Sequence, residues 1–405
     1  MILTRLVIII HHDRSMKSSV IRLSPLGMHD ENEWAVIEWL VTEDGGESVR
    51  LRHGVRDCDR HLLTDPGRGD HALAAILFRA MERGKDIVVE GEVSPKLLEG
   101  LETLQSIWRR WKPQRYRIVD IWAERESELT AIAPDRPALC AFSGGVDGTF
   151  SFYRHYLGLA GRNTRRPGAA MLVHGMDIPL ERNDFFLGAA RRAEKMLSAT
   201  GVPILLVRSS TRSLKMDWED SFGMQLFSCF LLFQKHFAWA INGSGEPYES
   251  LVLPWGSTPV TDPHCATAAM QLIIDGCAYD RTEKVRWLVD NTKIAQDLRV
   301  CWAGKQLDRN CGVCEKCIRT MLNFWALGAD IPEAFPSKLN PILVRSLRPR
   351  NEIQLRELLT LNRHAEKFHH QNDPILRSLK AVIFKYKIYK FKNDFFYYIR
   401  NFNLR

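Results

Sequence analysis

The periodicity of apolar positions divides this chain into three segments. In the first, strand-like runs occur at Thr4–Ile10, Glu33–Val41, Ser48–Leu51 and Asp86–Glu90. Apolar residues recur three to four positions apart, as in helices, over His71–Arg83 and Pro95–Trp111. This order of elements predicts a separate N-terminal α+β domain over residues 1–134, which ends in a proline-containing linker at Ala131–Pro137.

The second segment, residues 135–330, alternates short apolar runs with amphipathic ones. Buried strands are predicted to end at Phe142, His174 and Val207, and helices near Leu159 and Thr200. Strand and helix alternating at this spacing are typical of a doubly wound parallel sheet in an α/β fold. Gln225–Ile241 is mostly apolar, and we predict one long helix there.

The third segment, residues 331–405, predicts a helical region that becomes basic and aromatic towards its end. From Lys380 onwards Asp394 is the single acidic residue, and Phe384–Ile388 alternates strictly, as an edge strand does. Such an end is suited to RNA, to an anionic membrane or to another subunit. Packing on the parent domain explains the same pattern.

A glycine-rich stretch joins the first strand of the middle segment to its first helix. Its residues are Ser143, Gly144, Gly145, Val146, Asp147, Gly148 and Thr149. Amides at the start of a helix form a positive, concave surface that suits a phosphate, and the hydroxyls of Ser143 and Thr149 add donors. Asp147 is suited to fixing the loop or to holding Mg²⁺. The alternative is a turn without a ligand.

Ligands of doubly wound sheets bind at the carboxyl ends of the strands, where four loops of this segment converge. The candidates in the earlier loops are His174, Asp177, Arg208 and Arg212. Asp177 equally suits a capping role, and each arginine a solvated surface position. Contacts with a nucleotide or a substrate therefore remain one of two interpretations for these side chains.

The loop Gly243–Asp262 combines rigid prolines with polar and aromatic side chains. Trp255, Ser257 and Asp262 are its candidates for holding an aromatic or heterocyclic substrate. The competing interpretation is a proline-rich crossing in which Trp255 fills part of the core.

Four of the nine cysteines lie close together, with the spacing C-x9-C-x2-C-x2-C. They are Cys301, Cys311, Cys314 and Cys317. Four thiolates enclose a tetrahedral zinc ion and leave no open position, so the predicted zinc site is structural. An iron–sulfur cluster is the main alternative for this spacing.

Composition is that of an ordinary globular protein with an excess of positive charge. The net charge is +8, from 56 basic and 48 acidic residues, which suits phosphate-bearing ligands without establishing nucleic-acid binding. No apolar run approaches the ~20 residues of a transmembrane helix. Clustered cysteines favour a metal site over a disulfide framework, and we expect a cytoplasmic protein.

The glycine-rich stretch resembles the PP-loop of ATP pyrophosphatases, Ser-Gly-Gly-x-Asp-Ser-Thr, with Gly148 in place of the usual serine. Loop and cysteines together resemble 7-cyano-7-deazaguanine synthase over residues 138–327. The resemblance implies an adenine nucleotide alpha hydrolase-like fold, ATP and Mg²⁺ at the loop, zinc at the four cysteines, and catalytic roles for Ser143, Asp147 and Thr149. It also implies ATP-dependent adenylation of a carboxylate or amide, with release of AMP and pyrophosphate.

The sequence departs from the short biosynthetic enzymes in two places. It has a large N-terminal segment, and Pro254-Trp255-Gly256-Ser257 replaces their Gly-Arg-Asn loop. The resemblance is therefore to a longer, divergent branch, in which the acceptor is a modified base, a metabolite acid, or a group on a peptide or protein. Two alternatives stay open: a tRNA-thiolating enzyme, and a nucleotide sensor whose N-terminal domain binds a protein partner. A homodimer also stays open.

Overall fold

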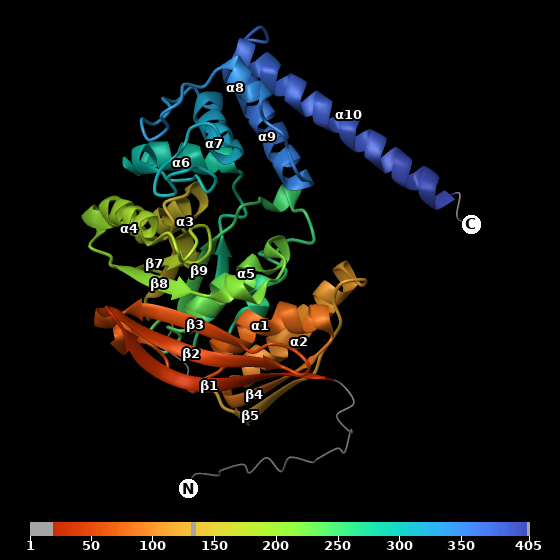
Figure 1. Cartoon of the computed structure of the whole chain (residues 1–405). Helices are drawn as coiled ribbons and strands as arrows, with labels where there is room; N and C mark the ends of the chain where they lie inside the picture. Colours follow the sequence, from red (N-terminus) through yellow and green to blue (C-terminus); the bar gives the residue numbers. More distant parts are fainter. Residues whose placement is uncertain (1–18, 131–134, 403–405) are drawn as a thin grey trace.

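The computed structural model describes residues 19–130 and 135–402, and its centre is one mixed sheet of ten strands. The strand order is β10-β9-β6-β7-β8-β3-β2-β1-β4-β5, and most neighbouring pairs are parallel. The strand predicted at Thr4–Ile10 lies outside the described residues. The fold is therefore α/β with a large, mostly parallel sheet (Figure 1).

The N-terminal part supplies five strands and two helices. The strands are β1 (Val20–Glu31), β2 (Trp34–Glu43), β3 (Val49–Arg56), β4 (Asp86–Val93) and β5 (Ile121–Glu126), and the helices are α1 (Asp70–Arg83) and α2 (Pro95–Trp111). The predicted helices and three of the predicted strands are confirmed, whereas β1 and β5 were not predicted. Helix α2 begins where Ser94 accepts a hydrogen bond from the Leu97 amide and proline takes the first position.

The middle part supplies five strands that are parallel to one another. They are β6 (Ala138–Ala141), β7 (Pro167–His174), β8 (Ile204–Ser209), β9 (Trp239–Gly243) and β10 (Gln271–Asp275); helices α3 (Val146–Tyr156), α4 (Asn183–Leu197) and α5 (Trp218–Leu231) connect them. From β6 the chain builds outward through β7 and β8, then returns to place β9 on the other side of β6. The strand order therefore reverses at β6.

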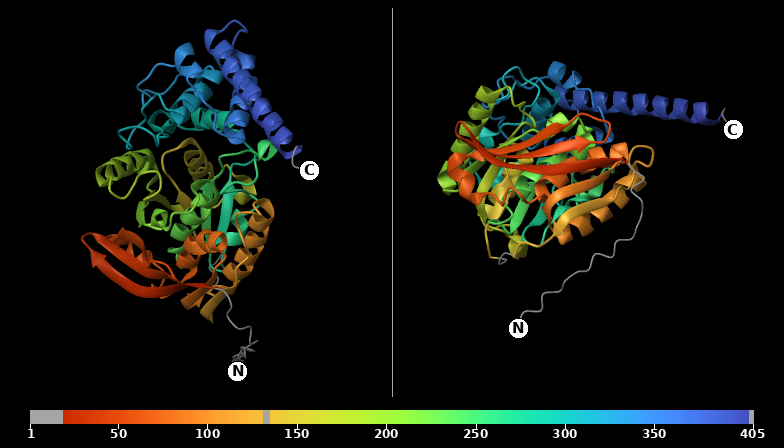
Figure 2. Two further views of the ribbon diagram at one scale, coloured as in Figure 1. Left: turned by 45° about the vertical axis from the view of Figure 1, so that its right-hand side comes forward. Right: turned by 60° about the horizontal axis from the view of Figure 1, so that its bottom comes forward.

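The two halves share the sheet through one antiparallel pair. Strand β3 pairs with β8, so that His53 lies opposite Ser209 and Val55 opposite Val207. A single apolar cluster extends from β1 and α1 across to α5 and β9. The segment predicted as a separate N-terminal domain thus continues the sheet of the middle segment, as Figure 2 shows from two sides.

One predicted helix is wrong. Gln225–Ile241 contains the end of α5, a turn after Leu231, and the first residues of strand β9. The run is apolar throughout because both elements are buried, and periodicity alone does not separate a buried helix from a buried strand. Gln234 lies in the turn, where its side chain is needed for a buried hydrogen bond.

The C-terminal part, which follows β10, is helical, and the helical region predicted over residues 331–405 contains the last three of its helices. Its elements are α6 (Arg281–Asn291), α7 (Glu315–Ala326), α8 (Pro341–Arg345), α9 (Glu352–Phe368) and α10 (Pro374–Phe402). The edge strand suggested at Phe384–Ile388 is wrong, since these residues belong to α10, which projects from the body (Figures 1 and 2). Within residues 19–130 and 135–402, every helix is too short or too polar to cross a membrane.

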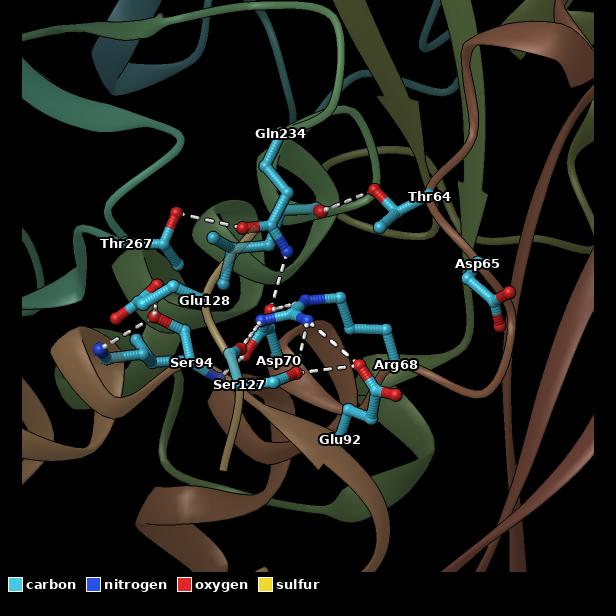
Figure 3. A network of polar contacts seen from close by, with 12 residues as sticks. Thr64, Asp65, Arg68, Asp70, Glu92, Ser94, Ser127, Glu128, Gln234 and Thr267 are labelled. Atoms are coloured by element: carbon cyan, nitrogen blue, oxygen red, sulfur yellow. Dashed lines mark hydrogen bonds and ion pairs between the residues drawn. The ribbon is translucent and has the colours of Figure 1, made fainter. Parts of the chain in front are cut away.

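A buried polar network joins the N-terminal part to the turn after α5 (Figure 3). Arg68 Nε donates to Asp70 Oδ2 at 2.7 Å, and both side chains are almost fully buried. Gln234 Nε2 donates to the same carboxylate oxygen at 2.7 Å, and Thr267 Oγ1 donates to Gln234 Oε1 at 2.8 Å. Because a buried carboxylate needs all of these donors, the network fixes the α5–β9 turn against α1.

Two buried histidines lie in the same interface. His53 on β3 and His71 on α1 pack edge to face, with ring centroids 5.3 Å apart, and His53 Nε2 lies 3.3 Å from the Ser228 hydroxyl on α5. Burial lowers the pKa of His53 well below its usual value and, against a hydrogen bond with the Arg68 backbone, lowers the pKa of His71 to about 4. Both rings are neutral at pH 7.

We predict that acid weakens the fold through these histidines. Between pH 6.5 and 4 the unfolded chain binds protons that the folded chain excludes, so the free energy of unfolding falls as the pH falls and levels off above 6.5. The contribution of His71 is up to about 3 kcal/mol. Urea unfolding at pH 7.5 and 4.5 measures it: His71→Leu should flatten the pH dependence, and His370→Gln, at an exposed position, should leave it unchanged. The same change in the free energy of unfolding between pH 7.5 and 4.5 in wild type and in His71→Leu would refute the prediction.

Candidate functional site

A cavity of about 280 Å³ opens at the carboxyl ends of β6, β7 and β9, where the strand order reverses. The glycine-rich loop forms its floor through Ser143, Gly145, Val146, Asp147 and Gly148. The segment after β7 adds Met176 and Asp177, helix α5 adds Trp218 and Phe222, and the C-terminal part adds Arg281, Arg299, Lys316 and Thr320. The lining therefore combines an aromatic wall with three cations.

The loop reaches this position because two glycines remove steric obstacles. Gly144 has φ +78°, a conformation that disfavours larger residues. At Gly148 a Cβ would lie 2.9 Å from the Ala141 carbonyl oxygen, so α3 starts closer to β6 than a serine permits. The amides of Val146, Asp147 and Gly148 belong to the first turn of α3, which has no intrahelical acceptors for them.

Asp147 carries the main ion pair of the cavity. Its Oδ2 accepts from Arg281 Nη2 at 2.7 Å, and its Oδ1 accepts from Lys284 Nζ at 3.2 Å; both cations lie on α6. Burial alone would raise the pKa of Asp147, but the charges of Arg281 and Lys284 outweigh burial and lower that pKa to about 2. The carboxylate is charged at every physiological pH and ties the loop to α6.

The ion pair continues into the C-terminal helices. Arg281 Nη1 also binds Glu357 on α9 at 3.0 Å, and Glu357 in turn pairs with Arg319 on α7. Glu315, one turn before Arg319, completes the series. With Asp147 and Lys284 the set contains three acids and three bases, so the buried charge is balanced.

Arg299 attaches the segment before the first cysteine to the loop. Its amide donates to the Gly144 carbonyl at 2.8 Å, and its guanidinium donates to the Leu307 carbonyl from Nε and Nη2 and to the Ser143 carbonyl at 3.4 Å. Arg299 is almost fully buried, yet part of it lines the cavity. It places a fixed positive charge beside Ser143.

The four cysteines lie together directly after Arg299. All four sulfur atoms fall within 4.8 Å of one another, with Cys301 and Cys314 3.7 Å apart and Cys311 and Cys317 4.0 Å apart. Four thiolates about 2.3 Å from a tetrahedral zinc ion lie roughly 3.8 Å from each other, so the spacing fits zinc. The prediction that these residues form a group able to hold a metal is confirmed.

The group supports the cavity from two sides. Cys301 follows Arg299 and Val300, and Cys314 caps α7 by accepting from the Cys317 amide, so that Lys316 and Thr320 face the cavity from the next turns. Gly312, at φ +74°, makes the turn between the ligands. A metal here orders both segments at once.

The proline-rich loop lies behind the aromatic wall. Trp255 packs edge to face on Phe222 with ring centroids 5.5 Å apart, and Arg212 stacks on Trp218 at 4.3 Å. Neither Trp255 nor Arg212 lines the cavity. Both instead position the two aromatic rings that do.

The half-buried Ser257 and the buried Asp262 form a chain of hydrogen bonds, called the relay below, that leads to the cavity. Asn242 at the end of β9 lines the cavity and donates from Nδ2 to Ser257 Oγ at 3.0 Å, and Ser257 Oγ donates to Asp262 Oδ2 at 2.6 Å. Burial raises the pKa of Asp262 to about 7, against the hydrogen bonds that it accepts.

Three further predicted residues, Thr149, His174 and Arg208, do not line the cavity either. Thr149 is fully buried in α3 behind the loop. His174 is buried too, where it stacks on Phe186 at 4.3 Å and its Nε2 lies 2.8 Å from the Pro179 carbonyl oxygen; burial lowers its pKa. Arg208 covers Trp34 at 4.0 Å and binds Asn183. The structure thus gives all three packing contacts.

Sequence reasoning missed the walls of the cavity. Trp218, Phe222, Arg281, Arg299 and Lys316 come from helices and turns without a recognisable motif. One signal was present: Arg281 and Lys284 are basic residues three apart on a short helix that follows the last strand. Their partner, Asp147, is 134 residues away from Arg281, so only the fold brings them together.

Comparison of the chain with protein-family models, with curated proteins and with solved structures finds no match.

We predict that the cysteine group binds about one zinc ion per chain and that Cys314→Ser reduces the content to near zero. Because the metal orders the segments on both sides, the variant should also unfold at a lower temperature. Elemental analysis and thermal unfolding measure the two effects. Cys58→Ser, at an exposed position, is the matched control. Iron with sulfide in the wild type, or unchanged zinc in Cys314→Ser, would contradict the prediction.

Proposed function

We propose that the protein is an ATP-dependent enzyme that adenylates a carboxylate or amide and releases AMP and pyrophosphate, as PP-loop enzymes do. The observation that carries the proposal is the position of the loop Ser143–Gly148: it lines a cavity at the start of α3, where the strand order reverses. Doubly wound sheets bind nucleotides at this point. The order of β6 to β10 supports such a sheet.

The residues of the cavity fit a triphosphate. The first amides of α3 and the Ser143 hydroxyl offer hydrogen-bond donors, and Arg281, Arg299 and Lys316 offer positive charge. These cations would stabilise the charge that develops on the departing pyrophosphate, which is how positioned donors lower such barriers. Asp262 is buried and does not line the cavity.

Asp147 does not fit as the main ligand of Mg²⁺, because Arg281 and Lys284 already bind its two carboxylate oxygens. A magnesium ion would arrive with the phosphates of ATP. Asp177 is the other carboxylate on the lining, and among the described residues it forms no ion pair. Asp177 is thus the better candidate for that ion.

Zinc, in this proposal, has a structural role. Four cysteine ligands fill its coordination sphere, and the group lies behind Arg299 and Lys316. None of the cavity-lining residues is a cysteine, which argues against tRNA thiolation through a reactive thiol. All nine cysteines are unpaired in the described chain, which supports a cytoplasmic location.

Of the acceptors left open by the sequence, we propose a planar heterocycle, as the resemblance to 7-cyano-7-deazaguanine synthase implies. Trp218 and Phe222 provide an aromatic surface next to the loop, with Leu226 and Met176 close by in the lining. Such surfaces favour flat rings. The product is then an amide or a nitrile on a deazapurine or a related acceptor, with ammonia as nucleophile.

We predict that the purified protein releases AMP and pyrophosphate from ATP when ammonia and a 7-carboxy-7-deazapurine are present. Ser143→Ala removes one hydroxyl donor to a charged phosphate, which is worth about 1.5–3 kcal/mol, and should lower kcat/KM by about tenfold or more. Ser106→Ala, on the exposed face of α2, is the control. ADP and phosphate as products would refute the proposal, and ATP binding without turnover would favour the sensor.

A second prediction concerns the residue that departs from the usual motif. Gly148→Ser restores the serine of the PP-loop family, but its Cβ would meet the Ala141 carbonyl at 2.9 Å. We therefore expect weaker ATP binding, not stronger, and the same loss in Gly148→Ala, because the Cβ and not the hydroxyl causes it. Equilibrium titration with ATP measures both. Tighter binding by Gly148→Ser than by wild type would contradict this explanation of the glycine.

A further inference from the structure

The lining of the cavity contains one amide side chain with a fixed orientation, that of Asn242. Asn242 is the next-to-last residue of β9, and Gly243 after it packs so closely on the loop that a Cβ would lie 2.5 Å from the Asp147 carbonyl oxygen. The side chain of Asn242 thus lies directly beside the loop. Its side-chain amide ends in a donor, Nδ2, and an acceptor, Oδ1. Only one of these two atoms is turned towards the cavity.

The orientation follows from hydrogen bonds that begin at Asp262. The Thr258 amide, which can only donate, binds Asp262 Oδ1 at 2.8 Å, and the Ser257 hydroxyl binds Oδ2 at 2.6 Å. Ser257 has a single hydroxyl proton and gives it to the carboxylate, so towards Asn242 the Ser257 oxygen can only accept. Asn242 must therefore turn Nδ2 to Ser257, at 3.0 Å, which leaves Oδ1 for the cavity.

The relay is built into the fold. Asp262 is almost completely buried, and no cation of the described residues lies within ion-pair distance of it, so hydrogen bonds alone hold the carboxylate. Gly223 lets the loop approach α5, because a Cβ there would lie 2.1 Å from the Gly256 carbonyl oxygen. Ser257 follows Gly256 and is therefore held against the helix that carries Phe222.

We propose that Asn242 Oδ1 selects a planar substrate that presents an N–H donor, with Asp262 as the positioning residue that sets this preference through Ser257. The inference rests on the proposed function and narrows its substrate class to heterocycles with an amino or ring N–H group next to the aromatic wall. A ring with only carbonyl or nitrogen acceptors at that edge is rejected, because it would face the lone pairs of Oδ1.

The direction of the hydrogen bonds in the relay can be reversed by one substitution, and this reversal is the test. In Asp262→Asn the Thr258 amide still requires an acceptor, so the new amide keeps its oxygen there and turns its nitrogen to Ser257. Ser257 must then donate to Asn242 Oδ1, and Asn242 turns Nδ2 to the cavity. This variant has nearly the same shape as wild type but exchanges an acceptor for a donor at the substrate edge.

The experiment measures binding of adenosine, guanosine and purine riboside at pH 8, above the pKa of Asp262, by calorimetry. Purine riboside lacks the amino group of adenosine and the amino and ring N–H groups of guanosine, so its six-membered ring presents only nitrogen acceptors. Wild type should bind adenosine or guanosine about tenfold more tightly than purine riboside, and Asp262→Asn should reverse that preference. Ser257→Ala breaks the relay, so the ratio of the nucleoside affinities in this variant should fall towards one. Asp290→Asn, exposed on α6, is the matched control.

Several outcomes overturn the inference: no binding of any of the three nucleosides, no preference in wild type, or the same preference in Asp262→Asn and Ser257→Ala as in wild type. The ring that Asn242 contacts is either the adenine of ATP or the acceptor substrate, and a saturating non-hydrolysable ATP analogue distinguishes the two. If the analogue displaces the nucleoside, Asn242 contacts the adenine of ATP; if both bind at once, Asn242 contacts the acceptor. Both results agree with the inference. A reversed preference without AMP formation would refute the proposed function alone.

Discussion

The structure depends most on the ion pair between Asp147 and the two cations of α6. Asp147 belongs to the glycine-rich loop, whereas Arg281 and Lys284 follow the last strand, and Asp147 and Arg281 both line the cavity. Through Glu357 and Arg319 the same pair reaches α9 and α7. A buried charge left without its partner is costly, so α6, α9 and α7 hold one another in place around the loop.

The described residues of the N-terminal half do not line the cavity but pack against an element that does. It shares the sheet through β3 and β8, and its helix α1 packs on α5, whose other side carries Trp218 and Phe222. Asp220 on α5 is buried and accepts from Tyr116 at 2.8 Å and from Lys112. These contacts hold α5, and with it Trp218 and Phe222, against the N-terminal part.

The metal group has a comparable role on the other side. It lies between Arg299 and α7, both of which contribute cations to the lining. The cavity is thus lined by elements of the middle and C-terminal parts, and its groups Asp147, Arg281 and Arg299 are fixed by partners within the protein. Such preorganised charges and donors are what an enzyme uses to stabilise a transition state.

Local chemistry was readable from the sequence, and long-range contacts were not. The loop with its glycines, the cysteine spacing and most helices and strands follow from residues close together in the chain, because turns, ligand spacing and periodicity are local properties. The apolar run Gln225–Ile241 was wrongly predicted as one helix, because elements that are buried on all sides show no alternation of apolar and polar residues. The partners of Asp147, the aromatic wall and the orientation of Asn242 were decided only by the fold, since each depends on packing between segments far apart in the sequence.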